Sequence, residues 1–143
     1  MNEFHNPIKI STKNARILVT GATGYIGGRL IPRLLGNGFK VRVLVRDKEK
    51  IRSKSWYKDV EVFEGDLTKP ELLLDLPKDV DQAYYLIHSM SNSEDYMALD
   101  RLVAENFVTL FKGIKHVIYL GGISPEGHQI SEHLNSRIEV GKI

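Results

Sequence analysis

Hydrophobic positions along the chain change repeatedly between two spacings from residue 16 onward. Short runs of consecutive or alternating apolar residues predict strands, and apolar residues three or four positions apart predict helices. The predicted strands are Ile17–Thr20, Lys40–Val45, Val60–Glu64, Gln82–His88 and His116–Leu120. Helical segments are expected at Tyr25–Gly36, Lys48–Lys54, Leu72–Leu74 and Ser93–Lys112, with another beginning near Ser131. Repeated strand–helix units are typical of parallel sheets with right-handed crossovers, so we expect an α/β doubly wound fold of about five strands.

Local signals refine these elements. Gly36-Asn37-Gly38 is a stop signal for the first helix, and Pro32 inside that helix removes one donor and should kink or strain it. Thr68 followed by Glu71 predicts a capping box for the short third helix. The nearly continuous apolar run Gln82–His88 is typical of a central strand covered on both faces.

The segment Arg16–Gly27 carries the strongest functional signal. A strand runs into Gly21, Gly24 and Gly27, and an amphipathic helix follows at once. Gly21 can take a positive φ, Gly24 leaves the backbone open to a pyrophosphate, and Gly27 lets the helix lie close to the strand. An anion would rest on the unpaired N–H groups of the helix. We interpret the segment as the dinucleotide loop of a Rossmann-type domain; the alternative is a purely structural turn.

The composition of the chain argues against several other classes of protein. The 143 residues carry a net charge of +2 and no cysteine, and the Lys and Arg residues are scattered, so nucleic-acid binding and disulfides are not expected. No apolar run is long enough for a membrane span, and the polar Met1–Asn14 has no apolar signal core, which favours the cytoplasm by default. His5, His116 and His128 share no metal-ligand spacing, so no metal site is predicted.

The predicted domain organisation is simple. Residues 1–14 are expected to form a flexible leader and residues 15–143 a dinucleotide-binding domain. The pattern stops inside a helix at Ile143, before a sixth strand and a substrate region. We therefore expect the domain to be incomplete at its C-terminus; the alternative is a naturally short five-stranded domain.

Several motifs together resemble one superfamily. Thr20–Gly27, Gly65-Asp66-Leu67 and Tyr119–Gly122 resemble the short-chain dehydrogenase/reductase superfamily, in particular its atypical and extended, NmrA-like members. The resemblance implies an NAD(P)-binding Rossmann fold, with Asp66 beside the adenine amino group and Leu67 against the ring. The alternative for Gly65-Asp66 is a turn that merely ends a strand. The cofactor-binding residues predicted from motif and resemblance are Gly21, Thr23, Gly24, Tyr25, Ile26, Gly27, Arg46, Asp66, Leu67, Leu86, Ile87, His88, Gly121 and Gly122.

The end of the second strand bears on the choice of cofactor. NAD-binding members place an acid there for the ribose hydroxyls, and NADP-binding members replace it with a cation. The matching position is Val45, and the next residue, Arg46, can form paired hydrogen bonds to a phosphate. We therefore expect a preference for NADP(H). The alternative is NAD(H), with Arg46 solvated and Asp47 serving the ribose.

The catalytic positions depart from the superfamily pattern of a Ser or Thr after the fifth strand and Tyr-x-x-x-Lys on the next helix. Here the fifth strand is followed by Gly121-Gly122, and the first hydroxyl is Ser124. His133 stands where the resemblance places the proton-donating Tyr, and Arg137 where it places the Lys. His133, Arg137 and Ser124 are the catalytic candidates; the alternative for His133 is an exposed helical residue without a role in the chemistry.

Three functions remain open. The leading hypothesis is an NADP(H)-binding oxidoreductase acting on a small carbonyl, imine or enone. The first alternative is a dinucleotide-binding regulator or redox sensor without hydride chemistry, and the second is a nucleotide-sugar epimerase or dehydratase. Besides the dinucleotide and an unknown small-molecule substrate, the resemblance implies a homodimer through the helix Ser93–Lys112. Phe111, one step off the apolar stripe of this helix, is the residue whose substitution tests that face; the alternative is that the stripe only covers its own sheet.

Overall fold

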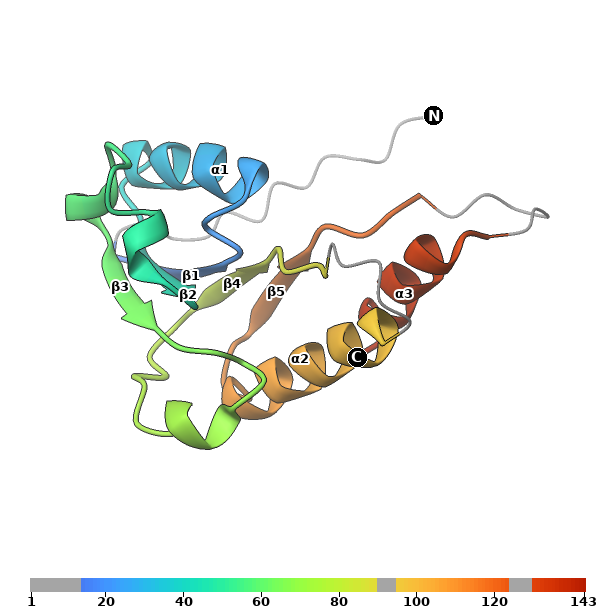
Figure 1. Cartoon of the computed structure of the whole chain (residues 1–143). Coiled ribbons are helices and arrows are strands. Elements are labelled where there is room, and N and C mark those ends of the chain that lie inside the picture. The colour runs from blue at the N-terminus through green and yellow to red at the C-terminus, as the bar shows by residue number, and fades with distance from the viewer. Residues whose placement is uncertain (1–13, 90–94, 124–129) are drawn as a thin grey trace, which may run out of the picture.

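Five parallel strands form the centre of the molecule. The computed structural model describes residues 14–89, 95–123 and 130–143. The strands are β1 (Arg16–Thr20), β2 (Lys40–Val45), β3 (Glu61–Glu64), β4 (Gln82–Tyr85) and β5 (His116–Tyr119). Their order in the sheet is β3-β2-β1-β4-β5, and all neighbouring pairs are parallel (Figure 1). The strand order therefore reverses between β1 and β4, and the predicted α/β doubly wound fold is confirmed.

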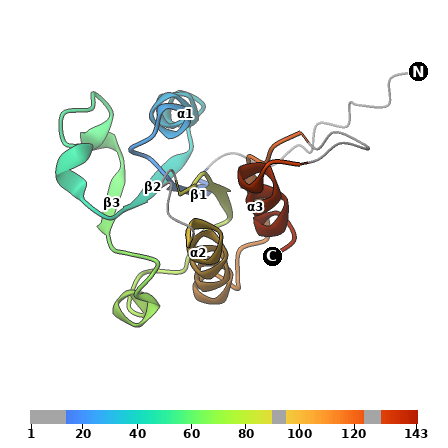
Figure 2. The ribbon, with the colours of Figure 1, turned by 45° about the vertical axis from the view of Figure 1, so that its right-hand side comes forward.

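Helices cover both faces of this sheet. The helices are α1 (Tyr25–Gly36), α2 (Tyr96–Leu110) and α3 (Glu132–Val140), and short 3-10 turns occupy Lys48–Lys50, Tyr57–Asp59 and Pro70–Leu73. Helix α1 lies on one face, and α2 lies on the other with α3 beside it (Figure 2). Ile17 and Val19 of β1 face the α1 side, and Leu18 faces the α2 side with Phe107. Because both faces are covered, the four successive residues Ile17–Thr20 of β1 are all buried.

The predicted fourth strand is too long. Strand β4 ends at Tyr85, three residues before His88. Tyr85 pairs with the last residues of both neighbouring strands, Thr20 and Tyr119, so no ladder continues beyond it. Leu86 and Ile87 continue the apolar pattern outside the sheet, which is why the pattern alone placed them in the strand.

Two helical predictions also need correction. The predicted helix Lys48–Lys54 is a single 3-10 turn, Lys48–Lys50. The capping box is wrong: the turn Pro70–Leu73 begins after Lys69, without a side-chain cap. The N–H of Thr68 is instead bound by the carboxylate of Asp66 at 2.9 Å. Helix α1 runs through Pro32 as one element. The predicted leader and the predicted helix start at Ser93 fall almost entirely outside the described residues.

Phe111 was the wrong residue with which to test a dimer face. It is only 5% exposed, belongs to the core on the α2 side, and its ring centroid lies 5.2 Å from that of Phe107. Most of the predicted α2 stripe is buried against the protein's own sheet, as the alternative stated. The exposed apolar residues of α2 are Leu99, Leu102 and Val108.

Candidate functional site

The glycine loop between β1 and α1 brings three backbone segments into close approach. Gly21 has a φ of 76°, and a Cβ built on it would lie 2.7 Å from the carbonyl oxygen of Leu86. A Cβ on Gly27 would lie 2.4 Å from the oxygen of Gly21 and 2.9 Å from the Cα of Ala22. Gly27 therefore lets α1 pack against the turn itself rather than against the strand. A side chain at Gly21 or Gly27 would force the backbone apart.

Gly24 differs from the other two glycines because nothing in the fold fills the space beside it. Its built Cβ meets only the Gly21 oxygen, at 3.4 Å, and its φ of −78° and ψ of 169° suit any residue. Gly24 is the N-cap of α1, and no side chain caps this end. Gly24, Tyr25 and Ile26 are exposed, so the first N–H groups of α1 are open to an anion.

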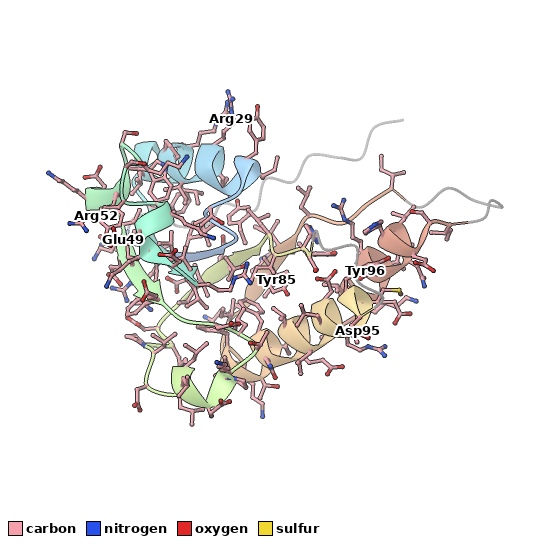
Figure 3. The ribbon with its side chains drawn as sticks, in the orientation of Figure 1. Arg29, Glu49, Arg52, Tyr85, Asp95 and Tyr96 are labelled. Carbon is pink, nitrogen blue, oxygen red and sulfur yellow. The ribbon has the colours of Figure 1, made fainter. Side chains whose placement is uncertain are left out.

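The side chain of Tyr25 lies on the outside of the loop. It is 73% exposed, and Arg29 donates to its hydroxyl at 3.0 Å while the guanidinium lies 5.2 Å from the ring centroid. Arg29 projects from the side of α1 remote from the sheet (Figure 3). At the edge of the sheet, the glycine loop therefore presents its backbone groups, whereas the side chains of Tyr25 and Arg29 lie on the outside.

The ends of β2 and β3 place a cation beside a carboxylate. Arg46 directly follows β2 and is exposed, and Asp66 follows β3 and is half-buried. Burial alone would raise the pKa of Asp66, but its hydrogen bonds from Thr68 and the charges of Arg46 and Lys69 outweigh this, and the pKa is lowered. Asp66 is therefore an anion at neutral pH, close enough to Arg46 for their charges to interact.

Two neighbouring candidates have other roles in the fold. Asp47 caps the following 3-10 turn by accepting the N–H of Glu49 at 3.0 Å. Leu67 is 4% exposed and its side chain belongs to the core, while its carbonyl oxygen accepts the side-chain amide of Asn106 at 2.7 Å.

The segment after β4 lies beside the glycine loop. Leu86, Ile87 and His88 are half-buried, and the Leu86 N–H donates to the hydroxyl oxygen of Thr20 at 3.3 Å. Burial lowers the pKa of His88, and the charge of Arg137 lowers it further, against the opposing effects of Asp100 and of a hydrogen bond to the Leu120 backbone. His88 is therefore mainly neutral at neutral pH.

Helix α3 carries the two described catalytic candidates in different surroundings. His133 is exposed, and its ring stacks on that of Tyr96 with centroids 4.6 Å apart and an interplanar angle of 23°. Arg137 is half-buried, and its carbonyl oxygen accepts the Tyr119 hydroxyl at 3.1 Å. Ser124, the third candidate, lies outside the described residues.

The loop after β5 runs along α3. Gly121 and Gly122 are both exposed. A Cβ on Gly122 would lie 2.4 Å from Cδ1 of Leu134 and 3.9 Å from Cδ of Arg137. The backbone of Gly122 is thus held against α3 beside Arg137.

All these segments follow the carboxyl ends of parallel strands and therefore meet at one edge of the sheet (Figure 1). The glycine loop and the segment after β4 lie at its centre, where the strand order reverses. Arg46 and Asp66 lie on the β2–β3 side, and His88 and Arg137 on the β4–β5 side. This edge is where doubly wound folds bind ligands.

Asp100, which is not among the residues predicted from the sequence, lies next to this edge. Asp100 is buried on α2 and accepts hydrogen bonds from the Ser89 N–H and the Ser136 hydroxyl. One signal for it was present: Asp100 lies on the same helical stripe as Tyr96, Val103 and Phe107, where a charged residue is unexpected.

The described ranges contain neither a candidate membrane-spanning helix nor a candidate metal site. No helix there has the length and apolar character that crossing a bilayer requires. In the same ranges no three His, Cys, Asp or Glu side chains come together in a way that could hold a metal ion.

Comparison with known proteins assigns the chain to a family. A model of the NmrA-like family matches residues 13–137. The chain belongs to the NmrA-like family. NmrA-like proteins bind NAD(P), and the solved structures similar to this chain include epimerases and reductases of the extended short-chain dehydrogenase/reductase type. The superfamily resemblance drawn from the motifs is thus confirmed.

Three similar proteins illustrate the extent of the match. Noscapine synthase SDR1 of Papaver somniferum is 30% identical over 95 residues, which are 61% of this chain and 27% of that protein. Triphenylmethane reductase of Citrobacter sp. is 27% identical with a TM-score of 0.69, over 89% of this chain and 44% of that one. WbmG of Bordetella bronchiseptica, solved with NAD and UDP, shares the fold at 17% identity and a TM-score of 0.68. The match covers 91% of this chain and 49% of WbmG. This NmrA-like chain spans about half the length of the solved structures that it matches.

Proposed function

We propose that this NmrA-like protein binds NADP(H) along the carboxyl edge of its sheet. The observation that carries the proposal is the glycine loop. Gly21 and Gly27 are required by the close backbone packing, but the space beside Gly24 is left open in front of an uncapped helix end. An open backbone at a helix N-terminus suits a pyrophosphate, whose charge favours the positive end of the helix dipole.

The remaining cofactor contacts follow from the position of each segment. Asp66, an acceptor after β3, suits the adenine amino group, and the half-buried Leu86–His88 segment suits the nicotinamide riboside. Gly121 and Gly122 suit the same end because they lie two and three residues after β5 and add no side chains there. The exposed α1 residues Tyr25 and Ile26 would contribute their N–H groups.

The preference for NADP(H) over NAD(H) rests on Arg46. Within the described ranges its guanidinium makes no hydrogen bond or ion pair, so it is available to a 2′-phosphate. Asp47, the acid that would serve an NAD ribose, is already engaged in capping the next turn at 3.0 Å. The pairing of Arg46 with a phosphate is therefore the better supported of the two assignments.

We further propose an oxidoreductase activity on a small carbonyl, imine or enone substrate. Bound NADPH would supply the hydride. His133 would donate the proton to the alkoxide, enolate or nitrogen anion that forms when hydride reaches a carbonyl, enone or imine, respectively. Arg137 would hold positive charge next to His133, one helical turn away. The reductase among the similar structures supports this reaction class.

A second function has an observation in its favour. His133 stacks on Tyr96 instead of lying free, and Gly121-Gly122 stand where the superfamily places a hydroxyl. A dinucleotide-binding regulator or redox sensor needs the loop but not these groups. The nucleotide-sugar epimerase alternative is supported only by similarity of fold.

Calorimetric titration with NADPH and NADH tests the binding proposal directly. Tighter binding of NADPH is expected, and equal or tighter binding of NADH refutes the role of Arg46. Oxidation of NADPH is then followed with a panel of carbonyls, imines and enones. Turnover with any of them supports the oxidoreductase, whereas tight binding without turnover favours the regulator.

A further inference from the structure

Asp100 joins three segments of the chain through one buried carboxylate. It is 8% exposed; Oδ1 accepts the N–H of Ser89 at 2.7 Å, and Oδ2 accepts the hydroxyl of Ser136 at 3.1 Å. Ser136 is itself 3% exposed. A buried carboxylate is expensive unless its oxygens accept hydrogen bonds, and apolar residues would pack two helices at lower cost. The arrangement therefore calls for an explanation beyond packing.

The two residues held by Asp100 are sequence neighbours of two site residues. Ser89 directly follows His88, and Ser136 directly precedes Arg137. The charges of Arg137 and Asp100 both affect the pKa of His88, so the three groups lie close together. The first turn of α2, where Tyr96 stacks on His133, lies against α3 (Figure 3). The carboxylate thus sits behind the β4–β5 half of the site.

We propose that Asp100 is a positioning residue for the nicotinamide end of the dinucleotide site. Its two hydrogen bonds fix the segment after β4 relative to α3, and this holds His88 and Arg137 on either side of the place where the nicotinamide riboside binds. The inference rests on the proposed binding of NADP(H). It assigns to Asp100 no contact with the cofactor itself.

The same helix supplies a matched control at the other end of the site. Asn106, less than two turns further along α2, donates from its side-chain amide to the carbonyl oxygen of Leu67 at 2.7 Å. Leu67 follows Asp66 on the adenine side. Asn106 therefore ties α2 to the adenine end as Asp100 ties it to the nicotinamide end. Loss of the Asn106 amide removes one hydrogen bond, and loss of the Asp100 carboxylate removes two.

The test compares two ligands. 2′,5′-ADP carries the adenosine half of NADP(H) and lacks the nicotinamide riboside. Asp100→Ala is expected to weaken NADPH binding about tenfold, equivalent to the loss of about one buried hydrogen bond, with 2′,5′-ADP affinity unchanged. Asn106→Ala is expected to weaken 2′,5′-ADP and NADPH alike. Asp100→Asn keeps an acceptor for Ser89 and a polar partner for Ser136, so its affinity for NADPH should be restored from that of Asp100→Ala to that of the parent.

A spectroscopic readout accompanies the affinities. The fluorescence of bound NADPH reports on the surroundings of the nicotinamide, and it should shift toward that of free NADPH in Asp100→Ala but not in Asn106→Ala. If Asp100→Ala does not fold, Ser136→Ala removes one of the two hydrogen bonds and should change both readouts in the same direction, to a smaller extent.

Different results refute different claims. Equal weakening of both ligands by Asp100→Ala, no weakening at all, or failure of Asp100→Asn to restore NADPH affinity overturns the positioning role and leaves the proposed function in place. Failure of the parent protein to bind 2′,5′-ADP or NADPH refutes the proposed function, and the role of Asp100 with it.

Discussion

Two of the glycines in the loop after β1 should respond to substitution in opposite ways. Gly24→Val places a side chain where only the Gly21 oxygen lies nearby, at 3.4 Å, on backbone angles that valine adopts. The free energy of unfolding should therefore change by less than about 1 kcal/mol. The new side chain would displace a pyrophosphate from the α1 N–H groups. Loss of one charge-assisted hydrogen bond costs about 1.5–3 kcal/mol, so NADPH should bind about 10- to 150-fold more weakly.

Gly27→Ala should instead damage the fold. The added Cβ would lie 2.4 Å from the Gly21 oxygen and 2.9 Å from the Ala22 Cα, both of which are backbone atoms. Normal contact requires about 3.5 Å, so α1 and the turn must separate by about 1 Å. Overpacking of this kind costs about 1–3 kcal/mol. For a domain of this size, the melting temperature should fall by about 2–12 °C.

Gly28→Ala is the matched control for both variants. A Cβ on Gly28 meets nothing within 4 Å, and the residue lies inside α1, where alanine is about 0.5–1 kcal/mol better than glycine. It should melt slightly higher and bind NADPH like the parent. Thermal unfolding without ligand and calorimetric titration with NADPH separate the two effects. If Gly24→Val binds NADPH like the parent, the loop is only a structural turn and does not bind the pyrophosphate. If Gly27→Ala melts at the same temperature as the parent, the close packing of Gly27 is contradicted.

The other predictions concern selectivity, chemistry and association. Arg46→Ala should weaken NADPH about 10- to 150-fold through loss of one charge-assisted contact and leave NADH nearly unchanged; equal losses by calorimetry would show that Arg46 does not bind the 2′-phosphate. If the protein reduces a carbonyl, His133→Phe should lower the rate about 10²- to 10⁴-fold with NADPH affinity retained, and an unchanged rate would assign the proton to another group. A homodimer through the outer face of α2 would bury Leu102 and Val108, so Leu102→Glu should give a monomer in light scattering; a dimer that persists excludes this face.

The strands of the sheet could be predicted from the sequence because buried parallel strands consist of short runs of apolar residues. β1, β2 and β5 begin or end within a residue of their expected positions. The end of β4 could not be predicted this way, because it is set by where Thr20 and Tyr119 end the neighbouring strands. The predicted capping box does not form for a local reason: the carboxylate of Asp66, two residues earlier, accepts the N–H of Thr68.

The pattern of hydrophobic and polar positions does not predict interactions between segments that are distant in the sequence. Arg42 alternates with apolar residues in β2 like an exposed position, yet only 4% of it is exposed. It is paired with Glu61 of β3 at 2.8 Å and with Asp79 at 3.1 Å, and it stacks on Phe63. The hydrogen bonds of Asp100 likewise come from segments 11 and 36 residues away. A sequence shows that such residues are polar, but their partners are set by the fold.

The two edges of the sheet treat their cations differently, and this difference supports placing the ligand at the carboxyl edge. At the amino edge, Arg16 and Arg42 are both paired with carboxylates, those of Glu61 and Asp79. Such pairs satisfy the charge within the fold and leave little for a ligand to gain. At the carboxyl edge, Arg46 forms no ion pair within the described ranges although Asp66 lies near enough to feel its charge. The exposed N–H groups at the start of α1 and the positive charge of Arg46 each favour an anion that arrives from solution. A dinucleotide phosphate at this edge would meet a guanidinium that makes no ion pair within the described ranges.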